Sequence, residues 1–380
     1  MKKFLTVLTA IALFGLIACE GPAGPAGKDG ATGPAGKDGA NGANGSNGTN
    51  GTNGVDAGFV YFEGFKSDLK CSTCHTPDTD TLYHKAAAKF QWSASKHAIG
   101  GTSFENSTTC AVCHTTEGFV QSQLGKTITQ ANNSTPVGCF ACHSPHIKGD
   151  FALRTTAPAT ILSNLAGVAD YTFDYGKGNL CAQCHKPRSQ SNKLDPSKST
   201  ATDDSIKITS GRWYSHYGVQ TQMLMGKGGY EWTNQTNVVS SSYHTTATAI
   251  KTEGCTICHM ANARGDYDGG HTMKLESDEG QNLNGCKTSG CHATITTLDY
   301  KGAMTKTHAN LDTLKVLLAT AGYLDTVANQ AKLVTIKPSN KAGALWNYFL
   351  VEHDLSAGVH NTEYANTLLR NSIAKMRGQF

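Results

Sequence analysis

Twelve of the thirteen cysteines in this chain occur in six short motifs, each of which ends in histidine and which we number one to six along the chain. Five motifs have the form Cys-x-x-Cys-His, and motif six, from Cys286 to His292, has four residues between its cysteines. The motif cysteines are Cys71, Cys74, Cys110, Cys113, Cys139, Cys142, Cys181, Cys184, Cys255, Cys258, Cys286 and Cys291. The histidines that follow them are His75, His114, His143, His185, His259 and His292. Since Cys19 alone remains, disulfide bonds, which an exported chain commonly forms, have no cysteines left to use.

This spacing has a specific chemical meaning. Two cysteines about one helical turn apart can add covalently to the two vinyl groups of a haem, and the adjacent histidine can then bind the iron. A single Cys-x-x-Cys also fits half of a zinc site or a thioredoxin-like redox pair. The histidine after all six motifs favours haem, and we interpret motif six as a variant attachment site. The sequence therefore predicts six covalently attached haem c groups.

The density of the motifs constrains the fold. Six haems between Cys71 and His292 leave about 37 residues for each, too few for a separate protein core around every one. We expect a mainly α-helical fold with long loops, in which short helices carry the motifs and packed haems supply the main buried apolar mass. Residues 58–300 form the predicted haem domain, and residues 301–380 form a helical segment that completes it.

Apolar periodicity predicts where the C-terminal helices lie. It indicates helices over residues 308–334 and 341–353, the first with leucines recurring on one face. A further helix is expected after Asn361, because asparagine is a good N-cap and the pattern from Tyr364 to Ile373 is helical.

The N-terminus indicates export. A short basic start and an apolar core make residues 1–18 a signal peptide. The run Leu16–Cys19 resembles a bacterial lipobox, in which Cys19 would be acylated, and Glu20 resembles a signal for sorting to the outer membrane. Ordinary secretory cleavage with a free thiol at Cys19 is the alternative. No run of eighteen apolar residues follows residue 18, so no membrane-spanning helix is expected after it.

A stalk is predicted over residues 19–57. Glycine occupies every third position from Gly21 to Gly54, a period typical of the collagen triple helix, where only glycine fits at the axis. That structure would make the protein a homotrimer. Prolines are few, however, and residues 41–53 are mainly Gly, Asn and Thr, which favours a flexible tether instead. Either form would hold the rest of an outer-membrane lipoprotein away from the lipid, at the cell surface or the periplasmic face.

Several runs outside the motifs resemble multihaem cytochromes c of respiring bacteria. These runs are Trp92–His97, His114–Phe119, His216–Glu231 and Gly269–Met273. The segment Asp354–Asn361 is similar to the C-terminal part of the multihaem superfamily that includes cytochrome c nitrite reductase and hydroxylamine oxidoreductase-related proteins. In that superfamily the histidine that matches His360 is the second, distal ligand of a haem iron. The resemblance covers residues 71–378.

Nine histidines remain after the six motif histidines, and the resemblance guides the choice among them. We predict as distal ligands His97, His146, His216, His244, His271 and His360. The histidines held in reserve are His84, His308 and His353. Pro145 can turn His146 away from the iron of its own motif and toward a neighbouring one. The methionines that could ligate iron instead are Met223, Met225, Met260, Met273 and Met304, but packing is the preferred interpretation while histidines suffice.

The predicted ligation points to electron transfer. An iron with two histidines exchanges electrons but has no vacancy for a substrate, so we predict a carrier rather than an enzyme, with no catalytic residue. The resemblance implies a relay at the outer membrane or cell surface in anaerobic respiration, with other cytochromes or an extracellular acceptor as partners. A filament with histidines donated between subunits is a variant. The net charge of +4 is too small and dispersed to suggest a nucleic-acid partner.

The alternative is a multihaem reductase of nitrite, hydroxylamine or a sulfur oxyanion. Such an enzyme needs one haem with an open face and nearby proton donors, and Tyr214, Tyr217 and Tyr243 lie close in sequence to proposed ligands. In the nitrite reductase family lysine replaces the proximal histidine at the catalytic haem. All six motifs here end in histidine, which departs from that pattern and favours the relay.

Overall fold

A computed structural model describes residues 65–68, 70, 84–100, 105–131, 133–235, 241–288 and 290–380. Spatial contacts divide the chain into two units, Met1–Gly54 and Val55–Phe380, and all described residues belong to the second. The predicted signal peptide, Cys19, the stalk over residues 21–54 and motif one, with Cys71, Cys74 and His75, lie outside the described residues. Within the described ranges, no helix combines the length and the apolar character needed to cross a bilayer.

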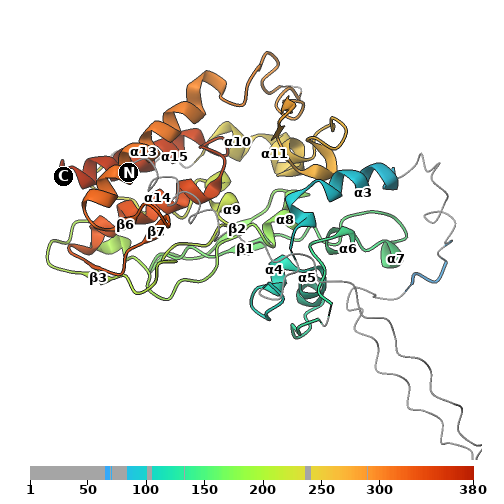
Figure 1. Cartoon of the computed structure of the whole chain (residues 1–380), viewed down its shortest axis with the longest axis horizontal. Coiled ribbons are helices and arrows are strands. Elements are labelled where there is room, and N and C mark those ends of the chain that lie inside the picture. The colour runs from blue at the N-terminus through green and yellow to red at the C-terminus, as the bar shows by residue number, and fades with distance from the viewer. Residues whose placement is uncertain are drawn as a thin grey trace, which may run out of the picture. The chain divides into compact units, whose positions relative to one another are not determined.

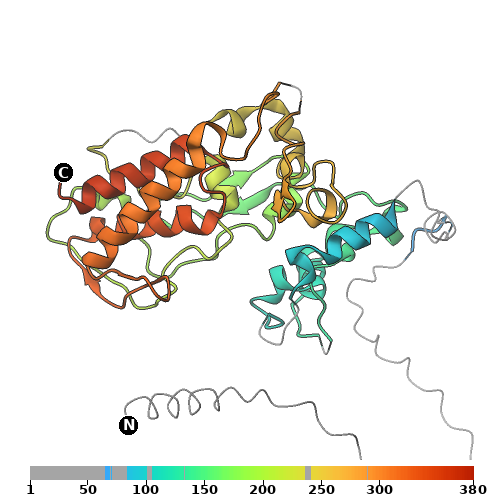
Figure 2. The same cartoon turned by 45° about the horizontal axis from the view of Figure 1, so that its top comes forward.

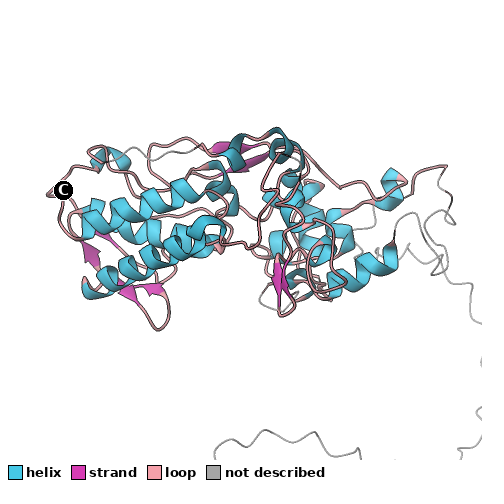
Figure 3. Ribbon diagram, turned by 90° about the horizontal axis from the view of Figure 1, so that it is seen from above, coloured by secondary structure: helices cyan, strands magenta, loops and turns pink. Residues whose placement is uncertain are grey.

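Short helices joined by long loops make up most of the described chain before residue 303 (Figures 1 and 3). The first are α3 (Lys85–Ser93), the 3-10 helix η1 (Lys96–Ala98), α4 (Ala111–His114), α5 (Thr116–Gln123), α6 (Cys139–Cys142), α7 (Pro145–Lys148) and α8 (Gly178–Ala182). They are followed by η2 (Pro196–Lys198), α9 (Gln220–Met225), α10 (Tyr243–Thr246), α11 (Thr248–Glu253), α12 (Thr256–His259), η3 (Gly270–Thr272) and η4 (Tyr300–Gly302). Motifs two to five lie on the four short helices α4, α6, α8 and α12.

The strands of the described residues are two or three residues long and form four two-stranded antiparallel sheets. The pairs are β1 (Ala159–Ile161) with β2 (Tyr171–Phe173), β3 (Ile206–Lys207) with β8 (Thr335–Ile336), β4 (Glu276–Ser277) with β5 (Gly280–Gln281), and β6 (Leu324–Asp325) with β7 (Gln330–Ala331). Ile206 lies opposite Ile336, so the β3–β8 pair ties the middle of the chain to its end. These elements confirm the predicted mainly α-helical fold with long loops.

Three long helices pack side by side near the C-terminus (Figures 1 and 2). They are α13 (Ala303–Thr320), α14 (Ala342–Asp354), which follows η5 (Ser339–Lys341), and α15 (Thr362–Met376). Helix α14 is buried along most of its length, and its Phe349 shares one core with Leu314 of α13 and Leu368 of α15. Asn347 of α14 accepts from the backbone N–H of Tyr230 at 2.7 Å and donates to the Tyr230 carbonyl at 2.8 Å, which fixes a distant loop against the helices.

This helical group adds a protein core to the haem-packed interior expected from the sequence. Loop residues such as Trp213 and Trp232 join the three helices in it, each with no more than 3% of its surface exposed. Around motifs two to four, by contrast, the buried cluster is small and consists of Phe119, Ala141 and Leu180. Ordinary side-chain packing therefore accounts for the C-terminal part of the fold without any cofactor.

The predicted helix over residues 308–334 is wrong in its second half. Helix α13 ends at Thr320, and Gly322 follows with a φ of 77°, the left-handed conformation that glycine adopts readily at a helix end. Leu324, whose spacing resembles a helical repeat, belongs instead to β6 and is buried in the same core as the α13 leucines. An apolar face can thus continue past a helix end when the chain turns back as a hairpin.

Candidate metal centres

All five described motifs present their histidine in the same way. In motif two the His114 N–H donates to the carbonyl of Cys110 at 3.1 Å, and motifs three to five repeat this bond at 2.8–3.0 Å. In motif six the His292 N–H donates to the carbonyl of Cys286 at 2.9 Å, although two more residues separate its cysteines. The longer motif therefore places its histidine as the shorter ones do, which supports its interpretation as a variant of the same site.

Each of the five described motif histidines faces one other histidine. The distances between ring centres are 6.2 Å for His97 and His185, 6.3 Å for His114 and His216, 6.4 Å for His143 and His271, 6.0 Å for His244 and His292, and 6.2 Å for His259 and His360. In every pair, the histidine outside the motif is one of the distal ligands predicted from the sequence. The two members of a pair lie up to 128 positions apart in the chain, as His143 and His271 do, so the loops between the helices bring them together.

The spacing of the pairs fits one iron between two imidazoles. A ring nitrogen lies about 1.15 Å from its ring centre and a metal–nitrogen bond is about 2.0 Å long, so two imidazoles on opposite sides of one metal have centres about 6.3 Å apart. The five observed distances, 6.0–6.4 Å, surround that value. Direct ring stacking would bring the centres closer, and unrelated histidines would not share one distance.

The free ring nitrogen is the same in most of the paired histidines. Six of them contact a protein atom through Nδ1, which leaves Nε2 for a metal. The contacts are His97 with Met273 Sδ at 2.7 Å, His114 with Glu105 Oε1 at 3.4 Å, His185 with Gln220 Oε1 at 3.2 Å, His244 with Val359 O at 2.9 Å, His259 with Met273 O at 3.1 Å, and His360 with Asp354 Oδ1 at 2.7 Å. These partners orient each imidazole toward the histidine opposite.

Burial favours the neutral form of six of the paired histidines, and a neutral imidazole is the form that binds a metal. Desolvation, followed by the charge of His185, lowers the pKa of His97 to about 4. Desolvation, followed by the charge of Arg188, lowers the pKa of His216 to about 4. Desolvation is also the largest cause of the lowered pKa values of His185, His244, His259 and His271.

His360 departs from this pattern. Burial acts to lower its pKa, but the charge of Asp354 and the hydrogen bond to it outweigh burial, so the pKa is raised. The Asp354 side chain is fully buried, and His360 Nδ1 lies 2.7 Å from its Oδ1. A buried carboxylate therefore lies beside this histidine.

The cysteines of the described motifs are free and half-buried, apart from the exposed Cys139. Burial raises the pKa of Cys142 and of Cys258 to about 12. No group of three or more His, Cys, Asp or Glu within the described ranges could hold a metal ion. Haem needs only two protein ligands and two thiols at each centre, and the described residues supply them.

Motif four lies in contact with motifs two and three. The Cys184 thiol is 3.9 Å from the carbonyl oxygen of Val112 in motif two, and its hydrogen bond to the Cys113 thiol lowers the pKa of the latter. Cys184 also belongs to the apolar cluster that contains Ala141 and Cys142 of motif three. Three attachment sites therefore converge at α8.

Motif five links motif four to motif six. A Cβ atom at Gly178, the first residue of α8, would lie 2.8 Å from the backbone nitrogen of Cys255, so only glycine allows this approach of the chain before motif four to motif five. A Cβ atom at Gly285, just before motif six, would lie 2.8 Å from Cys258 Cα. Motifs two to six thus form one connected set, with motif four joined to three others.

Motif one lies outside the described residues, so its ligands stay a prediction. His146, the remaining predicted distal ligand, packs against Phe65 and Phe140 with ring centres 5.1 Å and 5.7 Å away. Its backbone carbonyl accepts from the Lys66 N–H at 2.8 Å, so this histidine is held beside the segment that precedes motif one.

The three reserve histidines do not face a motif histidine in the described residues. His84 and His308 are exposed, and His353 is buried between Tyr214 and Tyr217 with ring centres 4.4 Å and 4.3 Å away. Among the methionines, Met273 contacts two paired histidines, His97 through its sulfur and His259 through its carbonyl. Such partners were not found from the sequence, because Met273 lies 176 residues from His97.

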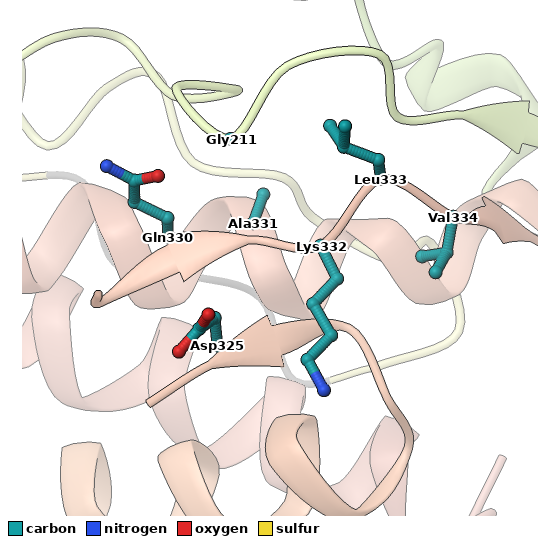
Figure 4. Close-up of a pocket in the computed structure, with 7 residues that line it drawn as sticks. All are labelled: Gly211, Asp325, Gln330, Ala331, Lys332, Leu333 and Val334. Carbon is teal, nitrogen blue, oxygen red and sulfur yellow. The ribbon is translucent and has the colours of Figure 1, made fainter. Parts of the chain in front are cut away.

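A surface pocket offers a different kind of candidate site. It is lined by Gly211, Asp325 and residues 330–334, and Figure 4 shows these around the β6–β7 hairpin. None of the lining residues is a cysteine or a histidine. The pocket therefore has no part in the metal centres.

No protein-family model matches the sequence, and no curated protein does. Among solved structures, the chain is similar to the one titled "Crystal Structure of Outer Cell Wall Cytochrome OcwA", with 20% sequence identity and a TM-score of 0.46. The similarity covers 75% of this chain and 49% of the other, so this chain spans about half the length of that protein. At this identity and TM-score the similarity does not define a family, and the assignment of the metal centres rests on their own geometry.

Proposed function

We propose that the protein is a c-type cytochrome that binds six haems covalently and relays electrons between them. The observation that carries the proposal is the pairing of five motif histidines with five others at 6.0–6.4 Å. Free cysteines one helical turn before each described motif histidine supply the atoms for covalent attachment.

The residues have separate tasks in this proposal. The motif cysteines hold the cofactors, and the paired histidines bind iron through Nε2 from both sides. Haem c supplies a carrier for one electron at each site. The two imidazoles exclude water and small molecules from the metal, and ligation without a thioether favours low reduction potentials. Contact between neighbouring motifs brings successive carriers close together.

For motif one we propose the same arrangement, with Cys71 and Cys74 as attachment points and His75 and His146 as the ligands. The N–H of Lys66 bonds to His146, which supports the placement of this histidine beside the chain that leads into the motif. The proposed total is therefore six haems with two histidines each.

We place the protein outside the cytoplasm as an outer-membrane lipoprotein. The signal peptide over residues 1–18, the acylated Cys19 and the glycine-rich stalk support an anchored position at the cell surface or the periplasmic face. The partners would be other cytochromes or an extracellular electron acceptor, and the stalk would allow a homotrimer or a filament. No nucleic acid takes part.

The test combines the haem count with the spin state of the iron. Pyridine haemochrome analysis of the exported protein should give six haems per chain, and ferric spectra should be low-spin throughout. The variant Cys286→Ala with Cys291→Ala should give five, which tests motif six directly. Fewer than six haems in the unaltered protein would contradict the proposal. A high-spin signal with rapid cyanide binding by one haem would favour the reductase instead.

A further inference from the structure

Residues 355–361 form the loop that joins α14 to α15 (Figures 1 and 2) and take part in two different pairs of histidines. His360 lies in the loop and faces His259. The carbonyl of Val359, one residue earlier, accepts from His244 Nδ1 at 2.9 Å. The loop is therefore part of the surroundings of two of the proposed irons.

Asp354, the last residue of α14, provides a charge at the start of this loop. Its side chain is fully buried, with Oδ1 2.7 Å from His360 Nδ1, while the Ser356 hydroxyl donates to Oδ2. Ser356 Oγ also accepts from the His360 N–H at 3.2 Å. Ser356 thus bonds to both the carboxylate of Asp354 and the backbone of His360, and these bonds fix the carboxylate relative to the imidazole.

The other Nδ1 contacts among the described residues are weaker or more exposed. His244 and His259 bond to backbone carbonyls, His185 to an amide oxygen and His97 to a thioether. His114 is 3.4 Å from Glu105, and 42% of the His114 side chain is exposed, so water screens that pair. Within the described chain, a buried carboxylate at hydrogen-bond distance distinguishes the His259–His360 pair.

We infer that Asp354 is a positioning residue that gives His360 anionic character and thereby makes the iron of motif five harder to reduce than those of the other described motifs. The inference rests on the proposed function. A carboxylate that accepts the Nδ1 proton raises the basicity of a metal-bound imidazole, which stabilises the ferric state more than the ferrous state. Reduction adds one electron, delivered by a neighbouring haem or by the redox partner, and the proton stays on Nδ1.

Asp354→Asn tests the inference because asparagine keeps an acceptor oxygen but removes the charge. One of the six midpoint potentials should rise by at least about 59 mV, which corresponds to a tenfold change in a one-electron redox equilibrium. One low-spin ferric signal should change, while the haem count stays at six. The control is Glu363→Gln, which removes an exposed carboxylate that pairs with Arg370 and should leave every potential unchanged.

A second variant keeps the inference testable if Asp354→Asn does not fold. Ser356→Ala removes the hydroxyl that shares the carboxylate, so one potential should fall rather than rise. Unchanged potentials in either folded variant, shifts of the same sign in both, or loss of the haem of motif five from Asp354→Asn would overturn the inference. Failure of the proposed function would look different, because the unaltered protein itself would then lack six low-spin haems.

Discussion

Burial and the charge of His216 keep His353 neutral. The residue is 3% exposed, packs between Tyr214 and Tyr217, and has a buried Nδ1 without a hydrogen-bond partner. Desolvation, followed by the charge of His216, lowers its pKa to about 4 from an ordinary value near 6.5. Above pH 6.5 this histidine is neutral in both the folded and the unfolded chain, so it does not change the free energy of unfolding. As the pH falls from 6.5 to about 4, the unfolded chain binds a proton there and the folded chain does not, so the free energy of unfolding decreases.

His353→Phe should remove this acid sensitivity. Because phenylalanine fits an aromatic environment and leaves no unpaired nitrogen, the variant should lose less stability between pH 6.5 and pH 4, by up to roughly 3 kcal/mol. Chemical denaturation at a series of pH values measures this difference. The exposed His308 provides the control, since His308→Gln should keep the acid profile. Loss of a low-spin haem in His353→Phe would show that His353 is a ligand after all.

Among the proposed ligands that the structure describes, His216 has an unusual backbone conformation. Its φ of 67° lies in the left-handed region, which few residues other than glycine adopt, and it faces His114 at 6.3 Å. His216→Ala should leave the sixth position of one iron open, so that one haem in six becomes high-spin and binds carbon monoxide or cyanide. His308→Ala is the matched control and should keep all haems low-spin. An unchanged spectrum in His216→Ala would remove His216 from the ligands.

The sequence predicted the distal histidines better than it predicted the residues that contact the Nδ1 atoms of the paired histidines. Histidines can be counted against motifs, and five of the six predicted distal residues lie opposite a motif histidine. The residues that contact Nδ1 atoms of the paired histidines are ordinary side chains or carbonyls, and some lie far away in the chain, such as Gln220 for His185 and Val359 for His244. Nothing in a single sequence marks a residue for such a contact, because loop folding alone brings it into place.

At the scale of the helices, local signals located ends that carry a cap. Asn361 was predicted as an N-cap, and its side chain accepts from the Tyr364 N–H at 3.3 Å at the start of α15. The C-terminal end of α13 was predicted wrongly, because Leu324 continues the leucine spacing beyond Gly322. Side-chain capping acts over three residues and can be read locally, whereas a hairpin that returns to the same core cannot.

The cap at Asn361 should stabilise both the helix and the ligand before it. Asn361→Ala removes an acceptor for an N-terminal backbone N–H of α15, which should cost about 1–2 kcal/mol of unfolding free energy. Since His360 directly precedes the cap, the ferric signal of one haem should broaden as well. Asn361→Ser, which retains a capping oxygen, should lose much less stability. Equal losses in both variants, measured by thermal unfolding, would mean that capping is not the reason for the asparagine.

For the whole molecule, the contacts between motifs define an order in which the proposed haems would exchange electrons. Motif four contacts motifs two and three through Cys184, the chain just before it contacts motif five at Gly178, and the chain just before motif six contacts motif five at Gly285. A sequence lists the motifs in a line, but the loops between them arrange the attachment sites as a branched set. Removing a branch point should therefore affect the relay more than removing an end.

Two variants that each lose one haem can separate these cases. Cys181→Ala with Cys184→Ala removes the haem of motif four, and Cys286→Ala with Cys291→Ala removes that of motif six. Because electron transfer slows steeply with distance, rapid reduction of the motif-four variant by a limiting donor should split into a fast and a slow phase. The motif-six variant should be reduced in one phase, as the unaltered protein is. Circular dichroism and a count of five low-spin haems would establish that both variants are folded. If both then give the same kinetics, the haems exchange electrons along routes that the contacts between motifs do not determine.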